Sequence, residues 1–142
     1  PQIDIDITDD MIVKYPDTSY KNLKKTISKN YKIKKSQISL FNGATSAIFE
    51  LLKHLHEKRV YLYAPLYGEY EKASFGKKII KIDRFTNLNA KVKKNSIVIF
   101  VNPSTPDAKY YNLNKLIRYW REQNCSIILD ESFLEFEKLK SF

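Results

Sequence analysis

The sequence predicts an α/β protein with a mostly parallel sheet, arranged in three layers as α/β/α. Short apolar runs alternate along the chain with segments in which apolar residues recur at helical spacing. Two of these runs, residues 96–101 and 126–129, are almost entirely apolar, which is typical of strands covered on both faces of a parallel sheet. The chain has 142 residues, of which 43% are hydrophobic and only 3 are Gly. We therefore expect a single domain over residues 1–142.

The amino-terminal residues are expected to precede the main fold. Ile and Asp alternate from Ile3 to Ile7, so residues 1–17 are predicted to form an extended, arm-like segment. A Tyr-Pro-Asp turn closes that segment, and Thr18 or Ser19 would cap the helix that follows.

The rest of the chain gives alternating helix and strand signals. Helices are predicted at residues 20–31, 44–55, 67–75 and 113–120, the last with Asn112 as its cap. Strands are predicted at residues 38–41, 60–64, 78–82, 96–101 and 126–129. Strands that alternate with helices favour a parallel sheet, and the strand at residues 96–101 is expected at its centre.

Composition narrows the classes of function. The formal charge is +9, with 21 Lys and only 4 Arg. Since base readout and bidentate phosphate recognition favour Arg, we interpret this charge as a solubilising surface and expect no nucleic-acid partner. No apolar run is long enough for a membrane span, and we expect neither a membrane partner nor a metal. The single Cys125 is interpreted as core packing, and a cytoplasmic location is expected.

Two carboxylates, Asp130 and Glu131, come directly after the apolar run at residues 126–129. Ligands of open α/β sheets bind at the carboxyl ends of the strands, so an acid here is well placed to meet a ligand cation. A helix cap or a solvated loop acid would explain the same residues.

Three further loops follow predicted turns or strands and would meet at the same edge of the sheet. Residues 42–46 (Asn-Gly-Ala-Thr-Ser) open a helix, and a helix start is a ready site for a phosphate. Residues 64–70 place Tyr67 just beyond a strand. Residues 100–106 form a polar, proline-containing loop after the central strand.

The order and spacing of these loops resemble one family. Together with Tyr15-Pro16-Asp17 and Leu129-Asp130-Glu131, they are similar to the large domain of fold-type-I pyridoxal-phosphate enzymes. The resemblance is to class I/II aminotransferases, in the branch of histidinol-phosphate aminotransferase and threonine-phosphate decarboxylase. It implies pyridoxal 5'-phosphate as cofactor, an amino-acid or amino-phosphate substrate, and a homodimer.

The resemblance also implies roles for individual residues. The main-chain N–H groups of Gly43, Ala44 and Thr45 would hold the cofactor phosphate, and Tyr67 would stack on the ring. Asp130 would pair with the protonated ring nitrogen, so that Asp130 and Tyr67 are the candidate catalytic residues. Tyr15 would reach the phosphate from the neighbouring subunit.

Two positions on the loops after the strands predicted at residues 96–101 and 126–129 differ from the family pattern. Asn102 begins the family's Asn-Pro loop and is a further candidate cofactor contact. Thr105 stands where the family has an asparagine that bonds the cofactor's phenolic oxygen. Phe133 stands where a tyrosine usually reaches the same oxygen, and phenylalanine is more familiar in the decarboxylase branch.

The family's Schiff-base lysine lies in a Ser-x-Ser-Lys-like segment well beyond the aspartate, and no lysine of this sequence matches that motif. We therefore expect a fragment of the cofactor-binding large domain, inactive by itself, from an aminotransferase. Three alternatives remain open: a threonine-phosphate decarboxylase-like lyase, a non-catalytic binding module of the same fold, and a basic domain that binds nucleic acid.

The missing lysine leads to a direct prediction. The 142-residue chain mixed with pyridoxal phosphate and a panel of amino acids should give no turnover, because no group is positioned to hold the cofactor covalently or to move the Cα proton. An assay for keto-acid and amine products checks this, and cofactor-dependent product formation would contradict it.

Overall fold

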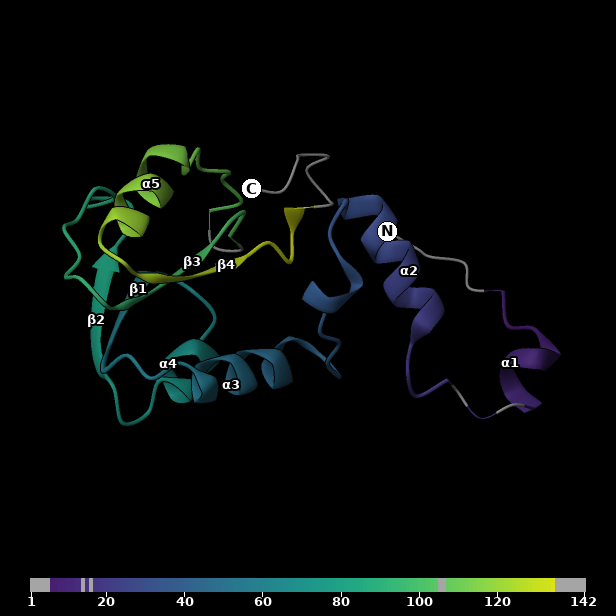
Figure 1. Ribbon diagram of the computed structural model, residues 1–142. Helices are drawn as coiled ribbons and strands as arrows, with labels where there is room; N and C mark the ends of the chain where they lie inside the picture. Colours follow the sequence, from purple (N-terminus) through teal and green to yellow (C-terminus); the bar gives the residue numbers. More distant parts are fainter. Residues whose placement is uncertain (1–5, 14, 16, 105–106, 135–142) are drawn as a thin grey trace. The chain divides into compact units, whose positions relative to one another are not determined.

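The computed structural model describes residues 6–13, 15, 17–104 and 107–134. The chain divides into two compact units, Pro1–Leu40 and Phe41–Phe142 (Figure 1). No helix within the described ranges is long and apolar enough to cross a membrane.

The second unit is built on a four-stranded sheet in which every pairing is parallel. Its strands are β1 (Arg59–Ala64), β2 (Lys78–Asp83), β3 (Ile97–Val101) and β4 (Ser126–Asp130). Their spatial order is β2-β1-β3-β4, so β1 and β3 are central. The α/β class, the parallel sheet and the central position of β3 are as the sequence predicts.

Helices cover both faces of this sheet, which completes the predicted three layers (Figure 1). On one face, α3 (Ala44–His54) and α4 (Glu69–Ala73) pack on a cluster that contains Val60 and Leu62. On the other face, α5 (Asn114–Glu122) packs on a cluster that contains Tyr61 and Tyr63.

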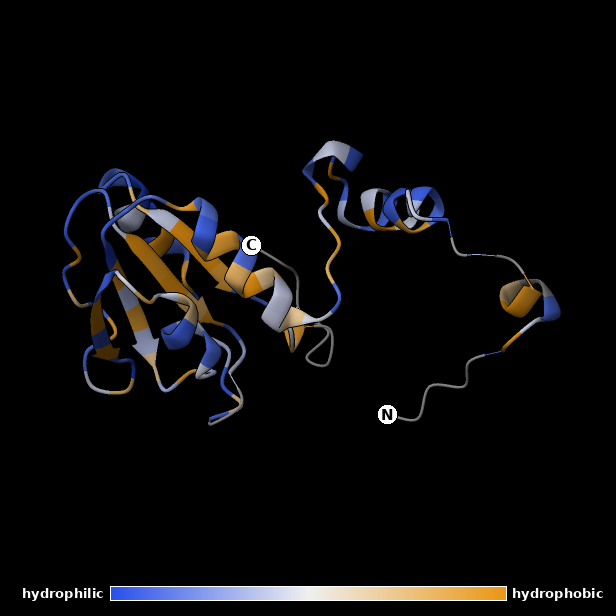
Figure 2. Ribbon diagram, turned by 90° about the horizontal axis from the view of Figure 1, so that it is seen from below, coloured by the Kyte–Doolittle hydropathy of each residue, from blue (hydrophilic) through white to orange (hydrophobic). Residues whose placement is uncertain are grey.

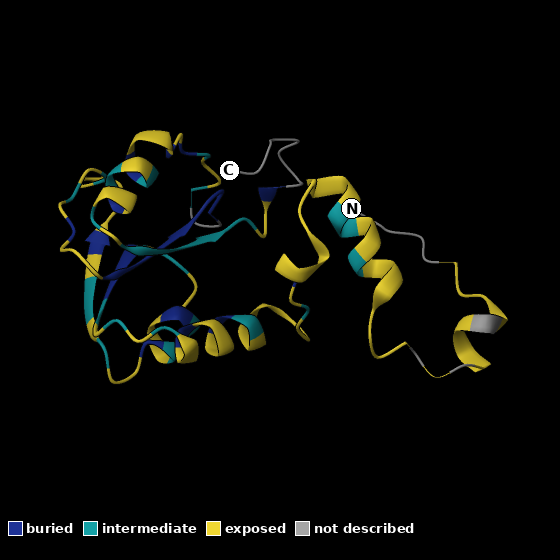
Figure 3. Cartoon of the chain, viewed as in Figure 1, coloured by how far each residue is buried: buried dark blue, intermediate teal, exposed yellow. Residues whose placement is uncertain are grey.

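The alternation along β1 follows from strand geometry, because successive side chains point to opposite faces. Both faces are apolar, and the central strands are accordingly hydrophobic and buried (Figures 2 and 3). Cys125 packs beside the α5-side cluster, and burial raises the pKa of its thiol, which suits a packing role rather than a nucleophile.

The connections between strands locate the ligand-binding edge. The chain passes from β1 through α4 to β2, and from β3 through α5 to β4. Because α4 and α5 cover opposite faces, the loops after β1 and β3 leave the sheet in opposite directions. Open α/β sheets bind ligands where neighbouring connections leave in opposite directions, beyond the carboxyl ends of the strands.

The edge position of β4 corrects one expectation. Residues 126–129 were predicted to be buried on both faces, but every residue of β4 is only half-buried. An apolar run indicates a strand that packs on two helical layers, whereas lateral burial depends on whether another strand pairs with its free side. Among the described strands, only β3 pairs with β4.

The first unit contains α1 (Asp9–Val13), α2 (Lys21–Tyr31) and a short 3-10 helix, η1 (Lys35–Gln37). The prediction of an extended segment over residues 1–17 is therefore wrong at residues 9–13, whereas residues 1–5 lie outside the described residues. The strand predicted at residues 38–41 is also wrong, because no strand pairs with it in the described chain. Strand propensity by itself does not provide the ladder of hydrogen bonds that a strand needs.

The residue that prepares the start of α2 also differs from the prediction. Neither Thr18 nor Ser19 caps this helix; instead, the Asp17 carboxylate accepts hydrogen bonds from the backbone N–H of Lys21 and from the N–H and hydroxyl of Ser19. The hydrogen bonds from Ser19 and Lys21 hold the pKa of Asp17 below its usual value. In α5, the residue at the N-cap is Leu113 and not the predicted Asn112, although the side chain of Asn112 accepts the N–H of Asn114 at 3.2 Å.

The burial of β1 generates a prediction on stability. Leu62 is 0% exposed between the sheet and the helices, whereas Leu51 on α3 is 47% exposed. Leu62→Ala should lower the free energy of unfolding by about 2–5 kcal/mol, because it removes buried methyl groups and leaves a cavity. Leu51→Ala is the matched control for urea denaturation, and an equal loss in both variants would contradict this account of the core.

Candidate functional site

The start of α3 is shaped to receive an anion. Gly43 precedes the helix with φ 91° and ψ 160°, a backbone conformation that residues with a side chain rarely adopt. The first N–H groups of an α-helix have no partner within the helix, and no side chain caps α3. These N–H groups, from Ala44 onward, give the helix start a partial positive charge that suits a phosphate.

Tyr67 joins the loop after β1 to this helix start. The residue is 55% exposed, and its hydroxyl oxygen lies 3.3 Å from Thr45 Oγ1, where either hydroxyl can donate. The contact places an aromatic ring beside the first turn of α3.

Asp130, the last residue of β4, is held by three donors. The hydroxyl of Tyr70 donates to Oδ2 at 2.7 Å, while the N–H and hydroxyl of Ser132 donate to Oδ1 at 2.9 and 2.5 Å. A carboxylate offers roughly four acceptor positions, so these bonds fix its orientation and leave capacity for one more donor.

Of these donors, Tyr70 lies furthest from Asp130 in the sequence. It lies in the first turn of α4 and is only 3% exposed. Burial raises the pKa of its phenol well above 10.0, and the hydrogen bond to Asp130 and the charge of that carboxylate raise it further. Tyr70 is therefore a fixed donor to Asp130 over the whole physiological pH range.

Asn102, at the end of β3, anchors the loop that follows. Its side-chain amide donates to the carbonyl oxygen of Tyr111 and accepts the N–H of Tyr111, each at 2.9 Å, and the side chain is fully buried. Its backbone N–H donates to the carbonyl oxygen of Asp130 at 2.8 Å. Asn102 thus positions the loop relative to β4, and its contact with a cofactor stays a prediction.

A cleft of about 280 Å³ separates α3 from the end of β4. Ala44 at the helix start and Asp130 at the strand end both line it, together with apolar side chains of α3 and the hydroxyl-bearing residues Tyr70 and Ser132. The anion-binding and carboxylate ends of the site therefore open into one space. Among the described residues, no group of three or more His, Cys, Asp or Glu could hold a metal ion.

A family model for aminotransferase class I and II matches residues 7–139, most of the chain. The chain belongs to this family.

Individual relatives agree with that assignment. The histidinol-phosphate aminotransferase of Clostridium kluyveri is 24% identical over 138 residues, which are 88% of this chain and 39% of that protein. The chain thus spans about two fifths of the length of this relative.

Solved structures show the same fold. L-threonine-O-3-phosphate decarboxylase from Porphyromonas gingivalis superposes with a TM-score of 0.76 at 20% identity, covering 87% of this chain and 41% of that one. Histidinol-phosphate aminotransferase from Sinorhizobium meliloti, in complex with pyridoxal-5'-phosphate, gives 0.65 at 15% identity, covering 86% and 37%. The aminotransferase family to which this chain belongs binds pyridoxal phosphate.

The aminotransferase fold brings most of the predicted site residues to one end of the sheet. These are Gly43, Ala44, Thr45, Tyr67, Asn102 and Asp130. Thr105 lies outside the described residues. Tyr15 is exposed and belongs to the first compact unit, so its role across a dimer stays a prediction.

Sequence reasoning missed Tyr70 and Ser132 as partners of Asp130. Tyr70 was treated only as part of a helix, although it follows Tyr67 by one turn and lies in the same loop-to-helix segment. Ser132, two residues after the aspartate, could have been recognised as an Asx-turn donor.

Tyr70→Phe tests how much this pairing contributes to the fold. Loss of the hydroxyl leaves Oδ2 of Asp130 without this donor, so the free energy of unfolding at pH 7 should fall by about 1–3 kcal/mol. Tyr67→Phe, at an exposed ring, is the control and should cost less.

The pH dependence of Tyr70→Phe has a definite sign. The pKa of the Tyr70 phenol is higher in the folded state than in the unfolded state, where it is near 10.0. The contribution of this phenol to the free energy of unfolding is therefore complete below about pH 10 and is lost as the pH rises above it. Wild-type stability should fall more steeply than that of Tyr70→Phe above pH 10 in urea titrations. Parallel slopes would show that Tyr70 ionises as in the unfolded chain.

Proposed function

We propose that this chain is the cofactor-binding core of a pyridoxal-phosphate-dependent aminotransferase similar to histidinol-phosphate aminotransferase. The whole protein would act on an amino acid or amino-phosphate, as a homodimer in the cytoplasm. The proposal rests on family membership and on one geometric observation: Ala44 and Asp130 line the same cleft.

The residues on this cleft fit the chemical groups of the cofactor. The N–H groups from Gly43 to Thr45 suit a phosphate, because a helix start offers several donors and a favourable dipole. The Asp130 carboxylate, already oriented by Tyr70 and Ser132, has acceptor capacity left for the N–H of a pyridinium. When bound, pyridoxal phosphate supplies an electron sink for the charge that develops at the substrate Cα.

The chain's own residues would orient and retain the cofactor. Asp130 keeps the proton on the ring nitrogen, and Tyr70 keeps Asp130 in one rotamer. Tyr67 provides a flat apolar surface beside the helix start, held near it through the hydroxyl of Thr45. Asn102 fixes the loop after β3 against β4, so that the floor of the site is stiff.

The full reaction requires parts that this sequence does not supply. The chain spans 39% of the Clostridium kluyveri relative, and neither lysine after Asp130, Lys138 or Lys140, lies in a Ser-x-Ser-Lys-like segment. Transamination is therefore proposed for the whole protein.

A threonine-phosphate decarboxylase-like activity is the second candidate. The exposed Phe133 stands where typical aminotransferases of the family have a tyrosine, and phenylalanine is more familiar in the decarboxylase branch. The fold superposes well on L-threonine-O-3-phosphate decarboxylase from Porphyromonas gingivalis. Both activities use the same cradle for the cofactor.

Pyridoxamine 5'-phosphate tests the cradle directly, because its binding requires no lysine. We expect calorimetric titration to show binding to the 142-residue chain, and weaker binding of pyridoxamine, which lacks the phosphate. Asp130→Asn should weaken binding about 10- to 100-fold by removing the charged partner of the ring nitrogen.

Asp83→Asn is the matched control, since Asp83 ends the parallel strand β2 and its carboxylate accepts hydrogen bonds from the N–H of Phe85 and the hydroxyl of Thr86. Equal affinity in wild type, Asp130→Asn and Asp83→Asn would remove Asp130 from the site. Absence of binding to the wild-type chain would remove the proposed cradle.

A further inference from the structure

Arg84 is a buried cation on the opposite face of the sheet from the α3 cleft. It follows β2 directly and is only 1% exposed. Its guanidinium carbon lies 5.4 Å from the centre of the Phe100 ring, which belongs to the cluster under α5. Nη1 donates to the carbonyl oxygen of Val101 at 3.2 Å.

The other two nitrogens of this guanidinium have no partner among the described residues. Both Nε and Nη2 of Arg84 are buried without a hydrogen bond. These two nitrogens carry parallel N–H groups on one edge of the guanidinium plane, the edge that binds both oxygens of a carboxylate. A buried charged donor without an acceptor is costly, so this free edge indicates a missing ligand.

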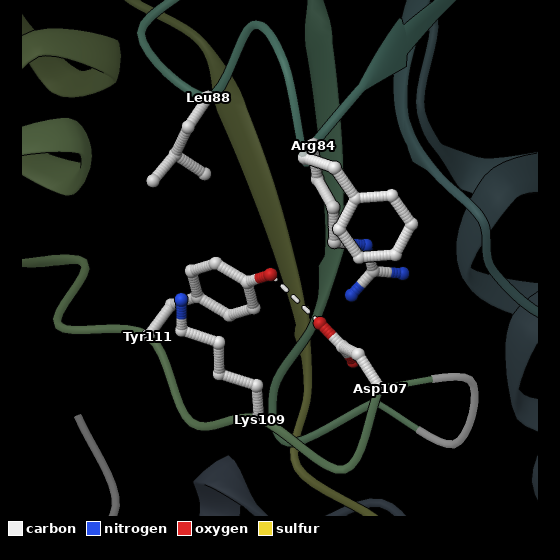
Figure 4. A pocket seen from close by; sticks show the side chains of 6 residues that line it. Arg84, Leu88, Asp107, Lys109 and Tyr111 are labelled. Atoms are coloured by element: carbon white, nitrogen blue, oxygen red, sulfur yellow. Dashed lines mark hydrogen bonds between the residues drawn. The ribbon is translucent and has the colours of Figure 1, made fainter.

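A carboxylate with a free oxygen faces the same space. Oδ2 of Asp107 accepts the hydroxyl of Tyr111 at 2.7 Å, whereas Oδ1 is buried and has no hydrogen-bond partner in the described chain. In Figure 4, the Arg84 guanidinium and the Asp107 carboxylate point toward each other across the pocket.

The space between them is a cavity of about 280 Å³. Its remaining lining consists of Phe85, Leu88, Lys109 and Tyr111. The ammonium of Lys109 lies 5.1 Å from the centre of the Tyr111 ring. This volume is slightly below that of pockets for drug-sized ligands, and it suits a small metabolite.

At neutral pH, Arg84 carries its positive charge and Tyr111 keeps its phenolic proton. Burial lowers the pKa of Arg84, and the Asp107 carboxylate opposes that shift, so a guanidinium of ordinary pKa 12.5 remains protonated. Burial and the hydrogen bond to Asp107 raise the pKa of Tyr111 to about 12, so its hydroxyl remains a donor to Asp107.

We propose that this pocket binds a free α-amino acid, with its carboxylate on Nε and Nη2 of Arg84 and its ammonium on Oδ1 of Asp107. In an α-amino-acid zwitterion, the carboxylate and the ammonium are attached to the same carbon. The carboxylate oxygens would accept from the two N–H groups of Arg84, and the ammonium would donate to Oδ1 of Asp107. A phosphate dianion would meet the negative charge of Asp107, and a simple amine would leave the Arg84 edge empty. Phe85 and Leu88 would contact an apolar side chain.

This site is independent of the proposed cofactor cradle. Arg84 contacts Phe100 of the cluster on the α5 side, whereas Ile48 and Tyr70 of the α3 cleft belong to the cluster on the other face. Binding here therefore requires neither pyridoxal phosphate nor turnover.

Calorimetric titration of the 142-residue chain without cofactor tests the proposal. L-Alanine and L-leucine should bind, at least about tenfold more tightly than acetate, methylamine or inorganic phosphate. Arg84→Lys keeps the charge but removes the paired N–H groups, and Asp107→Asn removes the partner of the ammonium. Each should weaken L-alanine about 10- to 100-fold, and Asp107→Asn should abolish the preference over acetate.

Arg118→Gln, at an exposed arginine of α5, is the control and should bind L-alanine as wild type does. Circular dichroism checks that each variant is folded. If Arg84→Lys does not fold, NMR shifts of the wild-type chain must place L-alanine next to the amides of residues 84–88 and 107–111.

Three results would overturn the proposal. The first is no detectable binding of either amino acid to the folded wild-type chain. The second is binding of acetate or phosphate as tight as that of L-alanine. The third is L-alanine binding that Asp107→Asn leaves unchanged, or NMR shifts confined to other residues.

Discussion

The parallel pairing of β1 with β3 is the constraint on which the rest of the second unit depends. Val60, Tyr61 and Leu62 lie beside Ile97, Val98 and Ile99, and both strands are covered on each face. Parallel neighbours cannot be joined by a tight hairpin, so each connection has to cross a face of the sheet. The crossovers go to opposite faces after β1 and after β3, and the polar loops therefore collect at one edge.

The polar groups at that edge are ordered because they are buried or half-buried. Asn102 uses its amide on the backbone of Tyr111, and Asp130 uses its carboxylate on Tyr70 and Ser132. A buried polar group without partners would destabilise the fold, so these bonds are required for stability as well as for orientation. The same contacts that stabilise the strand ends also stiffen the candidate site.

On the opposite face of the sheet, the buried polar groups of Arg84 and Asp107 are only partly hydrogen-bonded within the described chain. Each has part of its hydrogen-bonding capacity satisfied by the protein, Arg84 through Val101 and Asp107 through Tyr111. Each also retains buried atoms without a hydrogen-bond partner in the part of the chain that the structure describes, and both residues line one pocket. Local violations of polar satisfaction in an otherwise consistent fold are expected at functional positions.

Local sequence patterns determined the elements of the second unit. The apolar runs at β1, β2, β3 and β4 and the helical spacing over α3 and α5 were sufficient, because periodicity and turn residues act within a few neighbours. The order of the loops also predicts that Gly43, Tyr67 and Asp130 lie at one edge of the sheet.

Only the tertiary structure decided which side chains meet. The bond from Tyr70 to Asp130 joins residues 60 positions apart. The pocket beside Arg84 is also lined by Asp107 and Tyr111, which come from a later part of the chain. The predicted strand at residues 38–41 failed for the same reason, since its existence depended on a partner that local sequence cannot supply. Pairing and burial are set by the packing of distant elements, whereas propensity and periodicity are set by neighbours in the chain.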